Sequence, residues 1–311
     1  MALVRRCVGA VLLAVATASF GYLLAAAGLD ARSHFEGRSP APAPAVVEAQ
    51  LDAVNLNDRT PLAVRYRRWA SGIVRGDLGR TWDGAPVAAE LWPRLLVSLR
   101  LLLAGTVLGA VAGVVLAVLA VLRPWAGRLL TGCSLPLLAV PVFVLAVLLQ
   151  LAARSSGLGI EWVGEGEGAA GRLEHLVLPT LTVALGQIAL YGRYQRTLLR
   201  DVLESEHVRA ARARGLTRRR ALLRHGLPLT LVPTSAAFAY NLGLLLLGAV
   251  FLEKIYGWHG MGELLTDALR TSDVNTVAAC LAVAALLVPV ASVLASLFAA
   301  VLDPRTREGA R

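Results

Sequence analysis

Residues 206–215 read Glu-His-Val-Arg-Ala-Ala-Arg-Ala-Arg-Gly, and this polar stretch stands between two long apolar runs. Residues 193–225 carry ten arginines against three acidic residues. Helix-favouring residues dominate as far as Ala213, and Gly215 then predicts a turn or a helix C-cap. A basic helical insert on the inner side of a membrane protein favours a docking surface over a pore lining.

The composition places the chain in a membrane. Apolar residues make up 56% of it, and its mean hydropathy of +0.62 is higher than in most soluble domains. Apolar windows without charge cover residues 7–29, 101–122, 129–153, 176–192, 226–252 and 274–302. A span needs about 20 helical residues, so the fourth window is short and needs snorkelling by Arg193 and Arg196. The sequence predicts an all-α polytopic membrane protein with six transmembrane helices.

Arginine in short loops marks the cytoplasmic side of a membrane. The N-terminal tail, the loop after the second window, the insert 193–226 and the C-terminal tail share this bias, and the short loops between them are acidic. With six spans the four basic segments fall on one side. Both termini are therefore expected in the cytoplasm.

The windows divide the chain into an N-terminal transmembrane helix at 1–29, an extracytoplasmic cap segment at 30–94, a transmembrane core at 95–302 and a cytoplasmic tail at 303–311. The first window also resembles a secretory signal peptide, but its apolar stretch is long for one, which favours an uncleaved anchor. Within the cap segment, residues 46–56 and 62–76 have amphipathic helical patterns, and residues 76–80 predict a turn.

Several kinds of chemistry are excluded by the residues present. Lys254 is the one lysine of the chain and Ile255 follows it, so the chain holds no phosphate-binding P-loop. Neither His-Glu-x-x-His nor Gly-x-Ser-x-Gly occurs. We therefore expect a protein that is not an enzyme, with no metal site and no cofactor of its own.

The polar groups inside the spans have two interpretations. Gln187, Tyr191, Tyr240 and Asn241 either join helices through hydrogen bonds or line a polar translocation path. Acidic and histidine residues, which form proton or ion relays, are missing from the middle of the windows. A path without such a relay takes its energy from a partner.

The insert is the candidate contact for that partner. Glu206, Ala210, Ala211 and Gly215 predict a helix with a small-residue face that ends in a turn, and Pro228 marks the return to the membrane. The alternative is a solvated basic loop that faces lipid headgroups. Positive-inside sorting already explains the charge, which disfavours nucleic acid.

The order of several motifs resembles the permease subunits of bacterial binding-protein-dependent ABC importers of the dipeptide, oligopeptide and nickel type. The similarity covers about residues 66–307, with matching stretches at 65–69, 75–79, 175–182, 251–262 and 302–305. Glu206, Ala210, Ala211 and Gly215, followed by Pro228, match that family's ATPase-coupling motif. The Pro-Gly-Asp-Pro sequence that the family often has after its first span is missing, and His259 stands where a proline is common.

The resemblance implies a type I permease in the bacterial inner membrane. Its partners would be a second homologous permease subunit, ABC ATPase subunits that bind the ATP, and an extracellular solute-binding protein. The substrate would be a peptide, nickel or a related small solute. The alternative is an orphan membrane scaffold or sensor that holds a soluble partner through the arginine-rich insert.

Overall fold

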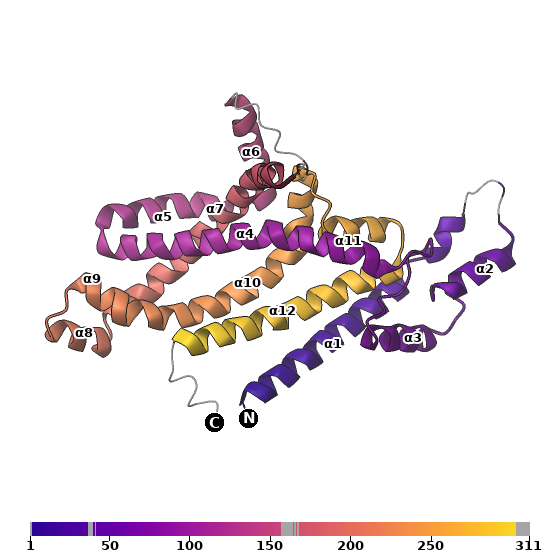
Figure 1. The fold of residues 1–311 in the computed structure, drawn as a ribbon, viewed down its shortest axis with the longest axis horizontal. Helices are drawn as coiled ribbons and strands as arrows, with labels where there is room; N and C mark the ends of the chain where they lie inside the picture. The colour runs from indigo at the N-terminus through magenta and orange to yellow at the C-terminus, as the bar shows by residue number, and fades with distance from the viewer. Residues whose placement is uncertain are drawn as a thin grey trace.

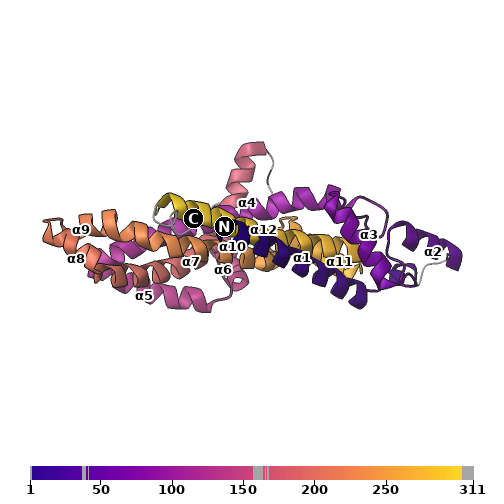
Figure 2. The same cartoon turned by 90° about the horizontal axis from the view of Figure 1, so that it is seen from below.

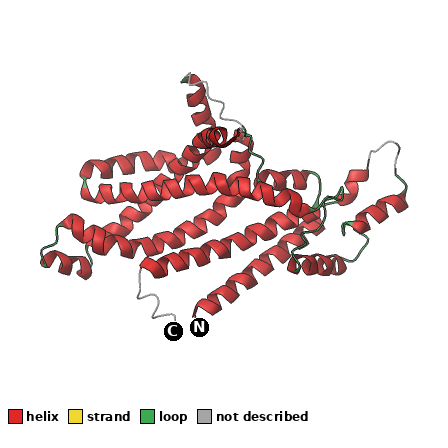
Figure 3. Ribbon diagram, in the orientation of Figure 1, coloured by secondary structure: helices red, strands yellow, loops and turns green. Residues whose placement is uncertain are grey.

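The fold is a bundle of long helices with short helices at its two ends (Figures 1 and 3). A computed structural model describes residues 2–36, 40, 42–156, 164, 166 and 168–302. The long helices are α1 (Ala2–Gly28), α4 (Val87–Leu122), α7 (Gly168–Leu203), α10 (Leu227–Tyr256) and α12 (Val274–Leu302). The shorter elements are η1 (Ala31–Phe35), α2 (Pro44–Ala53), α3 (Leu62–Val74), α5 (Pro124–Ala139), α6 (Val142–Ser155), α8 (Glu206–Ala213), α9 (Arg218–Ala221), the π-helical η2 (Leu222–Gly226) and α11 (Met261–Arg270).

The prediction of an all-α polytopic membrane protein is confirmed. In the described part of the chain, α1, α4, α7 and α12 are long and apolar enough to cross a membrane, and the bent pair α5 and α6 makes a fifth candidate. The window 226–252 falls on α10, whose 30 residues extend about 45 Å at 1.5 Å per residue. The six predicted windows thus correspond to five long helices and one bent pair.

The apolar pattern predicted one continuous helix for the third window. In the structure this window is divided between two helices, α5 and α6. The chain bends by 106° between α5 and α6. Val140 has extended backbone angles and Pro141 is the N-cap of α6. Proline disfavours helical geometry in the residue before it and cannot continue a helical hydrogen-bond ladder. The break therefore follows from Pro141, whose effect on the helix is not visible in the hydropathy pattern.

The fourth apolar window, residues 176–192, is short for a membrane span, but in the structure it belongs to a much longer helix. α7 runs for 36 residues and continues past the window to Leu203. The first three arginines of the predicted insert, Arg193, Arg196 and Arg200, consequently lie on α7 itself. The separate insert begins after Leu203, and we use "insert" below for residues 204–226.

Small residues bring α4 and α7 together. A Cβ added to Gly109 would lie 2.5 Å from the Cβ of Gln187, and one added to Gly105 would lie 2.5 Å from the Cβ of Val183. A Cβ on Gly113 would meet the Gly192 nitrogen at 2.9 Å. Glycines four positions apart line one face of a helix and let two backbones approach closely. The sequence contained this signal, and our interpretation of it did not use it.

The short elements η1, α2 and α3 pack on the ends of α1, α11 and α12. Buried side chains from all these parts form one apolar cluster that includes Tyr22, Leu51, Trp69, Ala268 and Val277. The Asn275 amide donates to the carbonyl oxygens of Val54 at 2.7 Å and Arg80 at 2.8 Å. The two helices and the turn predicted in this segment are present.

Figures 1 and 2 place α2, α3 and α11 at one end of the molecule and α8 and α9 at the other. α1 runs toward the end that holds α11, α4 runs back, and α10 and α12 repeat this alternation. The beginning of α1 and the end of α12 accordingly lie near each other in Figure 1, on the side toward the insert.

Candidate functional site

The insert starts with a sharp break after α7. Ser205 has extended backbone angles and is the N-cap of α8. Its hydroxyl donates to the Val202 carbonyl at 2.6 Å, and the Arg209 Nε donates to the Glu204 carbonyl at 2.9 Å. These bonds hold the start of α8 against the end of α7, so the two helices meet in a fixed corner.

The end of α8 is a Schellman motif. Gly215 has a φ of +89°, a conformation that only glycine adopts without steric cost. Its N–H bonds to the Arg212 carbonyl at 3.0 Å, and the Leu216 N–H bonds to the Ala211 carbonyl at 3.3 Å. The turn predicted at Gly215 is confirmed. Thr217 then caps α9 by accepting a hydrogen bond from the Arg220 N–H at 3.4 Å.

The insert has a small apolar core of its own. Val208, Ala211 and Ala221 are buried, and Leu216 packs against them. Ala211 is only 7% exposed, whereas Ala210 and Glu206 are exposed. The expected common face of two alanines is therefore corrected: Ala211 supports the insert from within and Ala210 belongs to its surface.

A second apolar cluster fixes the insert to the long helices. Ala117 and Val121 of α4, Leu199 of α7 and Leu222 of η2 are buried together. η2 leads into α10, where Pro228 occupies the first turn. Because proline has no N–H to donate, the wide π turn lies where the helical ladder is interrupted. The insert is thus a compact helix–turn–helix unit joined to three spans.

Three of the four candidate path residues come together between α7 and α10. The Asn241 amide donates to the Gln187 Oε1 at 2.5 Å and to the Tyr191 hydroxyl at 3.3 Å. Gln187 and Tyr191 are buried, while Tyr240 is 66% exposed and does not join them. These hydrogen bonds join α7 to α10, and the lining of a translocation path by the same residues stays a prediction.

A third polar residue on the same face of α7, Gln195, was not identified from the sequence. Gln195 is fully buried and its amide donates to the Thr230 hydroxyl of α10 at 2.7 Å, while its Oε1 accepts from Thr234. Residues 187, 191 and 195 are spaced by four, so they share one face of α7. That spacing was the available signal.

A buried carboxylate organises the joint between α10 and α11. Glu253 is 0% exposed; its Oε1 accepts from the Ser98 hydroxyl of α4 at 2.6 Å and its Oε2 from the Glu263 N–H at 2.9 Å. The Ser98 oxygen in turn accepts from the Met261 N–H at 2.8 Å. The sequence showed only that this loop is acidic, and the structural role of Glu253 was missed.

Comparison with known proteins identifies the family. Residues 105–308 match the family described as "Binding-protein-dependent transport system inner membrane component". The chain belongs to this family. It is 44% identical to the oligopeptide transport system permease protein OppB of Mycobacterium tuberculosis, over 95% of this chain and 96% of the relative.

Two further relatives have lower identity. The oligopeptide transport system permease protein AppB of Bacillus subtilis is 31% identical, over 83% of this chain and 84% of the relative. The glutathione transport system permease protein GsiC of Escherichia coli is 30% identical, over 68% of this chain and 69% of the relative. The chain is therefore a multi-pass permease component of a binding-protein-dependent transport system, and membership disfavours the orphan scaffold.

Proposed function

We propose that this permease imports peptides and that α8 couples it to a separate ATPase. The substrate class follows from the relatives, two of which are named for oligopeptide transport and one for glutathione transport. Because the chain has one lysine and no P-loop, ATP binds in partner ATPase subunits. An extracellular solute-binding protein delivers the peptide.

The observation that supports coupling is the rigidity of the insert. The Ser205 corner, the Gly215 turn and the Thr217 cap fix α8 at both ends. Beneath α8, the cluster around Val208 and Ala211 supports its exposed side. A partner that pushes on Glu206 and Ala210 moves α7 and α10 with the insert, because no flexible linker separates them.

A second homologous permease completes the path. The apolar groove between α4, α10 and α12 has a volume of about 530 Å³ and is lined by residues such as Val107, Val111, Phe238, Leu242 and Leu294. An uncharged groove of this kind fits a helix of the partner permease within the bilayer. The partly buried Gln187–Asn241 hydrogen bond joins α10 to α7 and helps keep α10 in place.

Orientation follows from the arginines. The insert and both termini lie in the cytoplasm, and the cap segment at residues 30–94 lies outside, where the binding protein docks. The packing of α2 and α3 on α1 and α12 is compatible with this arrangement.

The coupling proposal is tested with the complete importer in proteoliposomes. Glu206→Gln and Ala210→Trp change the exposed side of α8, and Arg270→Gln, at an exposed position of α11, is the control. We expect both α8 variants to lose peptide-stimulated ATP hydrolysis and labelled-peptide uptake. Glu206→Gln removes one member of a desolvated charge pair, which costs about 2–5 kcal/mol, and Ala210→Trp places a bulky side chain on the exposed side where the partner would dock. Wild-type stimulation in both variants contradicts the proposed docking of α8.

A further inference from the structure

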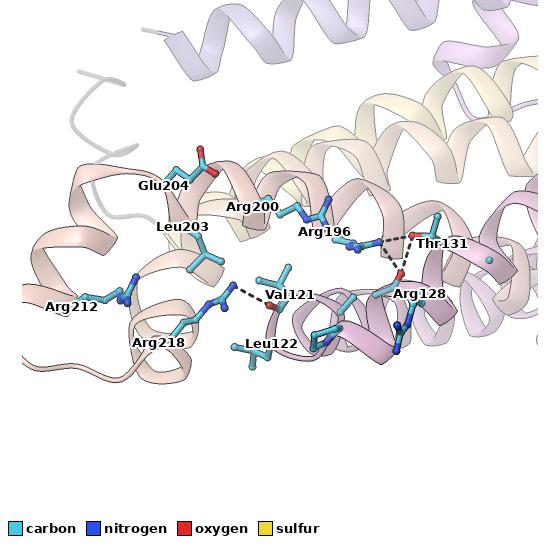
Figure 4. A pocket seen from close by; sticks show the side chains of 14 residues that line it. Val121, Leu122, Arg128, Thr131, Arg196, Arg200, Leu203, Glu204, Arg212 and Arg218 are labelled. Carbon is cyan, nitrogen blue, oxygen red and sulfur yellow. Dashed lines mark hydrogen bonds between the residues drawn. The ribbon is translucent and has the colours of Figure 1, made fainter.

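A wide, basic cavity lies where α4, α5 and α7 meet the insert. It has a volume of about 1170 Å³ and is lined by the turn between α4 and α5, the last turns of α7, and residues of α8 and α9 (Figure 4). Five arginines from four helices line it, namely Arg128, Arg196, Arg200, Arg212 and Arg218. Glu204 is the one acidic residue in the lining.

The positive charge of this cavity is not balanced from within. Across the described residues, none of the ion pairs involves any of these five arginines. In Figure 4 the Glu204 carboxylate points away from the guanidinium groups of Arg212 and Arg218. Gathering like charges is unfavourable unless an anion accompanies them. The geometry thus calls for an anionic ligand.

Two of the arginines are held in place by neutral groups. The Arg196 Nη1 donates to the Gly127 carbonyl at 3.0 Å and to the Thr131 hydroxyl at 2.6 Å. The Arg218 Nη2 donates to the Val121 carbonyl at 3.3 Å. These bonds position the guanidinium groups without neutralising them, so their remaining donors stay free for an oxyanion.

The depth of the cavity indicates which kind of anion it takes. The apolar window of α4 ends at Leu122 and that of α7 at residue 192, so the cavity begins where the hydrocarbon ends. Trp125, in the first turn of α5, is 57% exposed, and exposed tryptophan is typical of the headgroup level. An oxyanion site at this level lies where the headgroups of anionic phospholipids are found.

An apolar trough beside the cavity completes an amphiphile site. A second cavity of about 730 Å³ is lined by Arg123, Arg218 and Arg219 together with apolar residues of α4 and α10, including Val115 and Leu119. Arg218 lines both cavities. A headgroup held by the arginines therefore has an adjacent apolar surface for its acyl chain.

We propose that this cavity binds an anionic phospholipid, with the phosphate between Arg196 and Arg200 of α7 and Arg218 of α9. The lipid joins the end of a span to the insert, so membrane composition bears directly on the position of α8. Basic pockets between transmembrane helices on the cytoplasmic side are suited to such headgroups. This inference goes beyond peptide import, and its lipid-retention test does not depend on transport.

The test measures lipid retention by the purified full-length chain. The protein is incubated with mixed micelles of phosphatidylglycerol, cardiolipin and phosphatidylcholine, and the retained lipid is counted by native mass spectrometry. We expect phosphatidylglycerol and cardiolipin to be retained in preference to phosphatidylcholine. The double variant Arg200→Gln/Arg218→Gln should lower retention by about 30-fold, from the usual contribution of two basic residues near anionic lipid.

The control is Arg214→Gln/Arg220→Gln, which removes the same charge from exposed arginines outside the cavity. Arg200→Lys/Arg218→Lys keeps the charge and should restore most of the retention, which separates binding from misfolding. Equal losses in both glutamine pairs, or no preference for anionic lipid, overturn the proposal. So does displacement of the lipid by inorganic phosphate at equal concentration, since the acyl chain would then contribute nothing.

A partner protein with an acidic segment is the competing occupant. If the glutamine pair in the cavity keeps its lipid but the importer loses its ATPase subunits, the cavity belongs to that protein contact and the lipid proposal is wrong.

Discussion

The carboxylate of Glu253 accepts a hydrogen bond from the Ser98 hydroxyl at 2.6 Å, and this contact joins α10 to α4 across 155 positions of sequence. Ser98 passes the connection on by accepting from the Met261 N–H at 2.8 Å. Gly260 has no space for a side chain, because a Cβ there would lie 2.3 Å from the Glu253 carboxyl carbon. The start of α11 is thus set by one buried acid and one serine.

Ser98→Ala should therefore destabilise the chain by about 1–3 kcal/mol, because it leaves the Met261 N–H without its partner and removes a bond to the buried Glu253 carboxylate. The measurement is thermal unfolding of the purified protein in detergent. Ser296→Ala is the matched control, since the Ser296 hydroxyl is exposed and bonds only within its own helix. Equal unfolding temperatures for the two variants contradict the role given to Ser98.

Gly109→Leu should prevent α4 and α7 from packing. Even a Cβ at this position meets the Gln187 Cβ at 2.5 Å, and overpacking of a close contact costs typically about 1–3 kcal/mol and sometimes more. We expect a poor yield of monodisperse protein on size exclusion. Gly132→Leu, on a helix position with nothing within 4 Å, should purify normally. If the two variants behave alike, the close approach of α4 and α7 is not essential.

Gly215→Ala should loosen the insert without affecting the membrane spans. An alanine at a φ of +89° costs about 1–2 kcal/mol, and the Schellman bonds of α8 depend on that angle. We expect faster proteolysis within the insert and unchanged protection elsewhere. Gly215→Asn should be milder, because asparagine tolerates the left-handed region.

Ala211→Trp tests which side of α8 supports the insert. The Ala211 side chain lies in the cluster with Val208 and Ala221, so a tryptophan there overfills the core of the insert rather than its surface. Proteolysis of the insert should rise, whereas Ala210→Trp, on the exposed side, should leave proteolysis unchanged. Similar proteolysis in both variants contradicts the assignment of Ala211 to the core.

The parts of this fold that depend on local chemistry could be predicted from the sequence. Apolar windows located the long helices, and Gly215 located a turn that needs a positive φ. Features that depend on contacts between residues far apart in the sequence were harder to predict. The burial of Glu253 depends on Ser98 of another helix, and a hydropathy window registers neither partner.

The candidate site follows the same division. Asn241 and Gln187 were identified as polar residues in apolar spans, but their direct contact depends on the register of α7 against α10, which the close packing of α7 on α4 helps to set. The basic cavity likewise gathers arginines from four helices. Their positive-inside pattern predicted a side of the membrane, and only the fold brought them to one place.

The proposed coupling requires that the insert face the cytoplasm and that α3 and α11 face the outside of the membrane. Single cysteines at Ser71 and Ser272, in a background with Cys7, Cys133 and Cys280 replaced by serine, should react with an impermeant maleimide on intact cells. A cysteine at Arg219 should react only after permeabilisation, which also serves as its control for reactivity. The reason is the arginine bias of the insert and of the termini, since basic short loops stay in the cytoplasm. The helix directions agree with this, because α3, which contains Ser71, and α11, which ends two residues before Ser272, lie at the end of the molecule opposite the insert (Figure 1). Labelling of the Arg219 cysteine from outside would place α8 away from any cytoplasmic ATPase and remove the coupling proposal, while leaving the family assignment intact.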